Sequence, residues 1–186
     1  WFAYMKLVVN PNDDESFKRI ANKPARGISD NTMSLLITVA QQLQVPIFRV
    51  VYDVNLETYG LRPAAIQKVR EFCDAICAIQ TNAYSYPADV LVEQIDQTFG
   101  LYEFYKSQML KEEKDLKFED KVADLYNGIK HFVERKKSEI LEDQQIDGEG
   151  MCDDAVLKEN QHLLTLGAYL EDISLLSASD VDDEET

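Results

Sequence analysis

Apolar residues recur at helical spacing along most of the chain, and no convincing run alternates apolar and polar positions with a period of two. The strongest pattern alternates steps of four and three residues, through Phe118, Val122, Leu125, Ile129 and Phe132. This spacing places the apolar side chains on one face of a helix. The pattern therefore predicts an all-α fold, organised as a compact multi-helix domain.

Capping residues and prolines mark where the helices begin. The predicted starts lie at Asp13 or Asp14, Ser29 or Asp30, Pro46, Pro63 and Pro87. Residues 22–27 contain Pro24 and Gly27, which predicts a turn between the second and third helices. The polar, Gly-containing residues 142–158 predict a loop, and residues 163–176 predict a final amphipathic helix.

The charge of the chain is concentrated at one end. The 186 residues carry a formal net charge of −15, which at first argues against nucleic acid as a partner because phosphates repel acidic surfaces. Residues 1–137 hold 18 basic and 19 acidic residues, whereas residues 138–186 hold 1 basic and 15 acidic residues. We therefore expect one domain over residues 1–177 and a solvated acidic linker or tail over residues 178–186.

Several features bear on the origin of the chain. It begins at Trp1 without an initiator Met and closes on an acidic run, so we expect a piece excised from a longer protein. No apolar stretch reaches the ~18–20 residues that a membrane-spanning helix needs, so no membrane partner is expected. Three cysteines (Cys73, Cys77 and Cys152) form an odd set, which favours reduced thiols and a cytoplasmic location.

Motifs for catalysis are missing from the chain itself. It contains neither a Gly-x-x-x-x-Gly-Lys-Ser/Thr phosphate loop nor a Gly-x-Gly-x-x-Gly motif. His131 and His162 are far apart in the sequence, and there is no Cys-x-x-Cys pair, so no zinc site is predicted. We expect no catalytic residue, no metal site and no cofactor within this chain.

One basic turn does carry chemistry. Lys18, Arg19, Lys23 and Arg26 are four cations within nine residues, with no acid among them. Gly27 permits a positive φ, which lets the amides that follow point outward together. The free N–H groups at the start of the next helix can then donate hydrogen bonds to a phosphate oxygen. Lys23 and Arg26 would supply charge there, and three side chains would add donors: Ser29, Asn31 and Thr32.

Contacts of this kind hold a nucleic-acid backbone without reading its bases. The arrangement follows the helix–hairpin–helix logic of sequence-independent DNA binding. A second interpretation stays open at this point, because basic turns between packed helices are common and are usually only solvated.

Residues 2–28 resemble the start of the 2B domain of UvrD, Rep and PcrA helicases. That family has a helix followed by Asn-x-x-Asp-Asp and then Phe-x-Arg-x-x-Asn-x-Pro-x-Arg-Gly-Ile-Gly. The corresponding residues here are Asn10 to Asp14 and Phe17 to Ser29, of which Ser29 replaces the last Gly of the motif. The likeness is looser but collinear downstream, and residues 166–183 are similar to the family's last 2B helix and acidic linker.

The resemblance implies an accessory domain of a superfamily 1A helicase, an ATP-dependent enzyme that moves 3′–5′ on single-stranded DNA. ATP and Mg²⁺ would belong to the motor domains of the parent chain. The 2B domain would contact duplex DNA through backbone phosphates and swivel on the motors to control unwinding. Its expected partners are duplex DNA, the motor domains of its own chain, and repair or replication proteins.

The family's duplex contact maps onto the basic turn. It falls on Arg26, Gly27, Ile28 and Ser29, and the flanking cations are Arg19 and Lys23. The complete set of predicted DNA-binding residues is Arg19, Lys23, Arg26, Gly27, Ile28, Ser29, Asn31 and Thr32. Ser29 can still cap a helix and offer an N–H, but it brings a Cβ to a place where the backbone would approach a phosphate.

Two other functions remain open from the sequence. One is the equivalent insertion domain of an AddA- or RecB-like helicase–nuclease. The other is an all-α protein-interaction module without DNA contact, in which the basic turn is only solvated.

Overall fold

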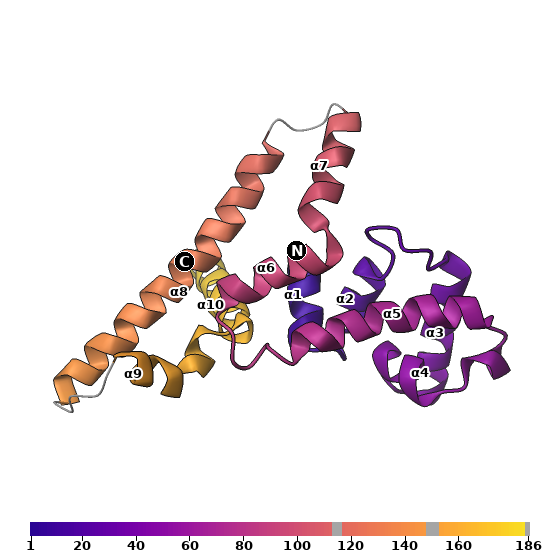
Figure 1. Cartoon of the computed structure of the whole chain (residues 1–186), viewed down its shortest axis with the longest axis horizontal. Coiled ribbons are helices and arrows are strands. Elements are labelled where there is room, and N and C mark those ends of the chain that lie inside the picture. The colour runs from indigo at the N-terminus through magenta and orange to yellow at the C-terminus, as the bar shows by residue number, and fades with distance from the viewer. Residues whose placement is uncertain (113–116, 148–152, 185–186) are drawn as a thin grey trace. The chain divides into compact units, whose positions relative to one another are not determined.

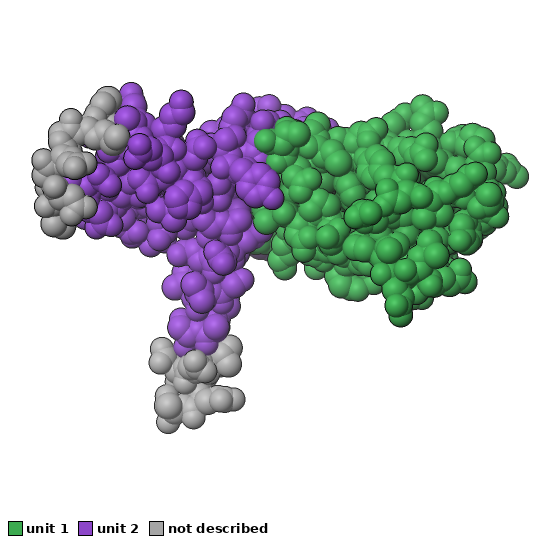
Figure 2. Space-filling view, turned by 90° about the horizontal axis from the view of Figure 1, so that it is seen from below, with its two compact units in different colours: residues 1–81 green, residues 82–186 purple. Residues whose placement is uncertain are grey.

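The computed structural model describes residues 1–112, 117–147 and 153–184, and in these ranges it contains ten α-helices, two short 3₁₀ helices and no strand (Figure 1). The all-α prediction is therefore confirmed for the described residues. The chain divides into two compact units, residues 1–81 (unit 1) and residues 82–186 (unit 2), which Figure 2 colours separately. The predicted boundary between a domain at 1–177 and a tail at 178–186 stays a prediction.

Unit 1 is built from five α-helices and one 3₁₀ turn. They are α1 (Phe2–Val9), α2 (Asp14–Ile20), α3 (Asp30–Leu43), α4 (Ile47–Asp53), η1 (Leu56–Tyr59) and α5 (Pro63–Gln80). The helix α5 packs against α1 and α4, α2 contacts the same two helices, and α3 packs on α4. Every helix start predicted in this unit is confirmed, because Asp13 and Ser29 cap α2 and α3 and a proline stands at or just before the start of α4 and α5.

The core of unit 1 is aromatic. Phe17 from α2 meets Phe72 from α5 and Phe48 from α4 edge to face, with ring centroids 5.6 and 6.4 Å apart. Aromatic pairs of this kind bury a large apolar area and also fix the relative orientation of the rings. Cys73 is also fully buried in this core, and burial raises the pKa of its thiol.

Among the described residues, no single helix is long and apolar enough to cross a membrane. Only α3 and α4 taken together meet these requirements of length and composition, and they are bent by 92° at their junction.

Unit 2 is dominated by a long helix. Its elements are α6 (Ala88–Phe99), α7 (Leu101–Lys111), α8 (Phe118–Asp147), α9 (Asp153–Glu159), η2 (Gln161–Leu164) and α10 (Leu166–Glu184). The helix α6 packs against α8 and α10, and α7 and α9 pack on α8. Ile129 and Phe132 of the predicted apolar face are buried in α8, together with Val133, whereas Phe118, Val122 and Leu125 are only half-buried. Phe132 packs edge to face on Tyr169 of α10 at 5.4 Å.

The helix α7 is absent from the sequence-based prediction. Gly100 ends α6 with a φ of 62° and at the same time precedes α7, so no polar linker separates the two helices. The Asp96 side chain accepts a hydrogen bond from the Tyr102 amide at 2.8 Å, and Leu101 is fully buried. These two contacts turn the chain directly into a new helix.

The predicted loop over residues 142–158 is wrong in part. The helix α8 continues to Asp147 and α9 begins at Asp153, while residues 148–152 lie outside the described residues. Ile140 and Val156 are buried, and they anchor helical segments whose other residues are mostly polar. Polar composition alone misses them because Glu, Gln and Lys are good helix formers. At the other end, α10 runs to Glu184, beyond the predicted start of the tail.

Candidate nucleic-acid interface

A side chain organises the turn between α2 and α3. The Asn22 Oδ1 accepts hydrogen bonds from the amides of Arg26 and Ile28, at 2.9 and 3.1 Å. The peptide bond between Lys23 and Pro24 is cis, and the Tyr4 hydroxyl donates to the Lys23 carbonyl at 2.6 Å. The turn is therefore fixed by contacts to its backbone rather than left as a loose loop.

The end of the turn leads into a capped helix. Gly27 has a φ of 78°, the positive value expected for it, and Ser29 is the N-cap of α3. The Ser29 Oγ accepts from the Thr32 amide at 3.2 Å and lies 3.0 Å from the Thr32 hydroxyl. Within the described residues, the amides of Asp30 and Asn31 meet no hydrogen-bond acceptor. Unsatisfied amides at a helix start, together with the helix dipole, favour an anion.

Arg26 is directed inward, unlike the outward cation that the sequence suggests. Its Nη1 donates to the carbonyls of Ile20 and Ala21, both at 2.7 Å, and its Nη2 donates to the Tyr4 hydroxyl. The guanidinium lies over the Phe72 ring, 4.8 Å from its centroid. Arg26 therefore ties the end of α2 to the core of unit 1.

The remaining predicted residues differ in exposure. Ile28 is 2% exposed and Thr32 is 4% exposed, so Ile28 belongs to the core and Thr32 to the cap of α3. Lys23 and Arg19 are exposed, and neither side chain makes a hydrogen bond or ion pair in the described part of the chain. Asn31 is also exposed. Lys23 and Gly27 in the turn, and Ser29 and Asn31 at the start of α3, are thus accessible to a ligand.

A further cation approaches the turn from α5. The side chain of Lys68 lies against the bare face of Gly27, where an added Cβ would come within 2.6 Å of the Lys68 Nζ. Lys18, by contrast, forms an ion pair with Glu15 one turn away on the same helix. Asp30, the first residue of α3, places a carboxylate in the same turn of helix and offsets part of the positive charge.

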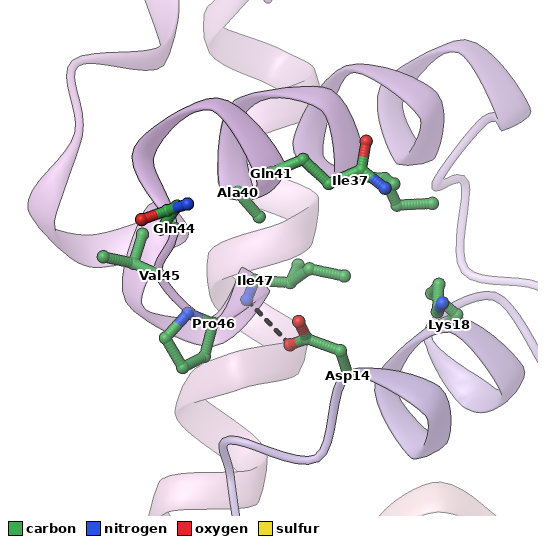
Figure 3. A pocket seen from close by; sticks show the side chains of 9 residues that line it. All are labelled: Asp14, Lys18, Ile37, Ala40, Gln41, Gln44, Val45, Pro46 and Ile47. Atoms are coloured by element: carbon green, nitrogen blue, oxygen red, sulfur yellow. Dashed lines mark hydrogen bonds between the residues drawn. The ribbon is translucent and has the colours of Figure 1, made fainter.

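A separate hollow of about 430 Å³ lies among α2, α3 and the start of α4 (Figure 3). Asp14 faces this hollow and accepts a hydrogen bond from the Ile47 amide at 2.8 Å. Aliphatic side chains from α3 and the 45–47 segment form most of its wall, and it contains none of the predicted DNA-binding residues. We also find, among the described residues, no group of three His, Cys, Asp or Glu side chains that could hold a metal ion.

Comparison with known proteins decides the family. A profile of the UvrD-like helicase C-terminal domain matches residues 1–183. The chain belongs to this family. Among curated proteins, this UvrD-like domain is similar to DNA helicase II of Salmonella typhimurium, with 25% identity over 139 residues that cover 75% of the chain and 19% of that protein.

Other relatives carry related names. ATP-dependent DNA helicase Rep of Buchnera aphidicola (subsp. Schizaphis graminum) is 29% identical over 115 residues, which cover 62% of the chain and 17% of the relative. ATP-dependent DNA helicase PcrA of Bacillus subtilis is 25% identical over 143 residues, which cover 75% of the chain and 18% of the relative. The chain therefore matches less than a fifth of the length of each of these relatives.

Three residues of this UvrD-like domain shape the turn but were not predicted to do so. Asn22 carries a local signal, because an Asn side chain that bonds nearby amides is a known way to close a turn. Tyr4 and Lys68 carry none, since they lie 19 positions before Lys23 and 41 positions after Gly27. Only the packing of α1 and α5 around the turn brings them there.

Proposed function

We propose that this chain is the 2B accessory domain of an ATP-dependent 3′–5′ DNA helicase, and that unit 1 contacts duplex DNA through backbone phosphates. The family membership and the helicase names of the relatives support the parent activity. The motif in residues 10–29, which resembles the start of a 2B domain, supports this location in the parent.

The observation that carries the DNA contact is the geometry after Gly27. The amides of Asp30 and Asn31 have no acceptor among the described residues, and the exposed Lys23 belongs to the same turn. A phosphate oxygen can accept from these donors, as anions do at other helix starts. Every nucleotide presents the same phosphate to backbone amides and lysines, so the binding would be independent of base sequence.

The parent enzyme would supply what this chain lacks. The chain contains no phosphate loop, so ATP and Mg²⁺ would be held by the motor domains of the same polypeptide. The domain would swivel on those motors to control unwinding, and repair or replication proteins would be its further partners. The free thiols of Cys73 and Cys77 agree with a cytoplasmic location.

The test is a salt titration of duplex binding. Fluorescence anisotropy of a labelled DNA hairpin would be measured with the full chain, at NaCl concentrations from about 50 to 200 mM. We expect weak binding that falls with salt, with a log–log slope of about −0.9 for each phosphate contact. A second hairpin of unrelated sequence should bind equally well.

Charge reversal provides the matched comparison. Lys23→Glu should weaken binding, whereas Lys130→Glu on α8 should not, although both lysines are exposed and make no ion pair in the described residues. The contact of the Lys23 carbonyl with Tyr4 involves the main chain, so Lys23→Glu should leave the turn intact. Three results would contradict the DNA contact and favour an interaction module: affinity that does not change with salt, no binding at about 50 mM NaCl, or equal binding by the two variants.

A further inference from the structure

The charge beside Gly27 comes from another helix. If Gly27 carried a Cβ, that atom would lie 2.6 Å from the Lys68 Nζ, 3.0 Å from its Cδ and 3.1 Å from its Cε. Real Cβ atoms do not come so close, so the alkyl stem and the ammonium of Lys68 occupy the space that a side chain at residue 27 would need. Lys68 and the turn therefore form one local surface.

Lys68 is available for a ligand. It is exposed, and among the described residues it forms no ion pair. Glu71, one turn further along α5, accepts a hydrogen bond from the Gln67 amide group at 2.9 Å and does not neutralise Lys68. A lysine ammonium with three donors on a flexible stem suits a phosphate oxygen whose position is set by other groups.

Arg26 is not available in the same way. Reaching outward would break its bonds to the Ile20 and Ala21 carbonyls and to the Tyr4 hydroxyl, and would leave buried acceptors without a donor. The arginine of the motif therefore serves the shape of the turn, and the charge that faces a ligand must come from lysines such as Lys23 and Lys68.

We infer that Lys68 is a phosphate-contacting residue of the duplex site, and that Arg26 is a positioning residue. This inference rests on the proposed DNA contact and adds a residue from α5 that lies outside the motif of residues 10–29. The phosphate held by the amides after Gly27 would meet the Lys68 ammonium on the bare side of the glycine. Gly27 would then serve two purposes. It adopts the positive φ of the turn, and its lack of a side chain leaves room for the Lys68 ammonium.

The test compares individual lysines in the full chain. Acetylation by a lysine-specific reagent would be quantified by mass spectrometry at Lys23, Lys68 and Lys130, with and without a saturating DNA hairpin at low salt. We expect several-fold protection of Lys23 and Lys68 and none of Lys130. Protection of Lys23 alone overturns the role of Lys68 and leaves the DNA contact standing. Protection of neither lysine overturns both.

Substitution supplies a second measurement. Lys68→Ala should weaken hairpin binding several-fold and make the salt slope less steep by about 0.9, whereas Lys68→Arg should retain most of the binding. The side chain is exposed, so the thermal unfolding midpoint of both variants should equal that of the wild type. Wild-type affinity and slope in Lys68→Ala, with Lys23→Glu still weakened, would show that Lys68 makes no contact.

Discussion

The two units of this chain differ in charge far more than in secondary structure. Unit 1 carries 9 basic and 8 acidic residues, and unit 2 carries 10 basic and 26 acidic residues. Both units are helical, yet unit 1 is nearly neutral and unit 2 is strongly acidic. A polyanion such as DNA is therefore repelled strongly by unit 2 but not by unit 1. The net charge of −15 is therefore a poor guide to DNA binding, because it sums the charges of a nearly neutral unit and a strongly acidic one.

The units also differ in what fixes their connections. In unit 1, side chains bond directly to the backbone at successive helix junctions, as Asn22 does in the turn and Asp14 does at the Ile47 amide. In unit 2, the Asp96 carboxylate does the same at the Tyr102 amide between α6 and α7, but the contact that Arg135 makes between α8 and α10 is a solvent-exposed ion pair with Asp172 at 3.1 Å. Exposed pairs contribute little to stability, whereas buried hydrogen bonds are costly to lose. This contrast predicts unequal responses to matched substitutions in the two units.

The largest difference should appear between two arginines. Arg26→Ala leaves two carbonyls and the Tyr4 hydroxyl without their donor, and should lower the free energy of unfolding by about 3 kcal/mol. Arg135→Ala removes pairs with Glu139 and Asp172 that are open to solvent, and should cost less than about 1 kcal/mol. Urea unfolding followed by circular dichroism measures both.

Arg26→Lys serves as the control for charge. An ammonium cannot reproduce the planar fork that spans both carbonyls and the hydroxyl, so this variant should recover only a small part of the loss. If Arg26→Ala and Arg135→Ala cost the same, Arg26 does not anchor the turn in solution.

Two asparagines give the next comparison. Asn22→Ala removes the acceptor for the Arg26 and Ile28 amides and should cost about 2 kcal/mol, because two main-chain donors lose their partner. Asn82→Ala in unit 2 removes one bond to the Gln94 side chain, at 3.2 Å, and should cost about 0.5 kcal/mol. Urea unfolding again provides the measurement. Asn22→Asp keeps the acceptor and should retain most of the stability; a loss equal to that of Asn22→Ala would contradict this role.

The sequence was sufficient to predict the structure where the contact that determines it lies within a few residues along the chain. Asp13 and Ser29 cap helices within three residues of themselves, and Gly27 takes the positive φ that its turn requires. It failed where the partners are distant. The inward direction of Arg26 depends on Tyr4 and Phe72, which reach it only after α1 and α5 have packed. The helix α7 was missed for a related reason, because burial of Leu101 rather than any motif establishes it.

Two glycines should respond with opposite signs. Gly27→Ala places a Cβ on a residue with φ 78° and against Lys68, and should cost about 1–2 kcal/mol from the backbone conformation alone. Gly128→Ala lies inside α8 with no atom within 4 Å of the new Cβ, and should add about 0.5–1 kcal/mol of stability. Thermal and urea unfolding distinguish the two.

The contact with Lys68 can be separated from the backbone cost at Gly27. In a Lys68→Ala background, Gly27→Ala should cost less than it does in the wild type, because the atoms that meet the new Cβ are gone. An equal cost in both backgrounds would show that the contact with Lys68 adds nothing to the cost of a side chain at residue 27.

The smallest expected difference concerns two carboxylates in acid. Burial alone would raise the pKa of Asp13, but hydrogen bonds from the Ser16 hydroxyl and amide outweigh it, and the pKa lies below its usual value. In unit 2, the hydrogen bond and charge of Lys106 hold the pKa of Glu119 below its usual value. Both pKa values are lowered by folding, so each group stabilises the protein above its unfolded pKa and loses that contribution as the pH falls through its folded pKa.

Salt separates the two carboxylates. High salt screens the exposed pair of Glu119 and Lys106, whereas the short-range bonds by which Asp13 caps α2 are screened much less. Urea unfolding between pH 3 and pH 6 in about 1 M NaCl should therefore show an acid loss that Asp13→Asn reduces and Glu119→Gln does not alter. Asn retains a capping oxygen without titrating, so a full acid loss in Asp13→Asn would mean that another group in the chain is responsible.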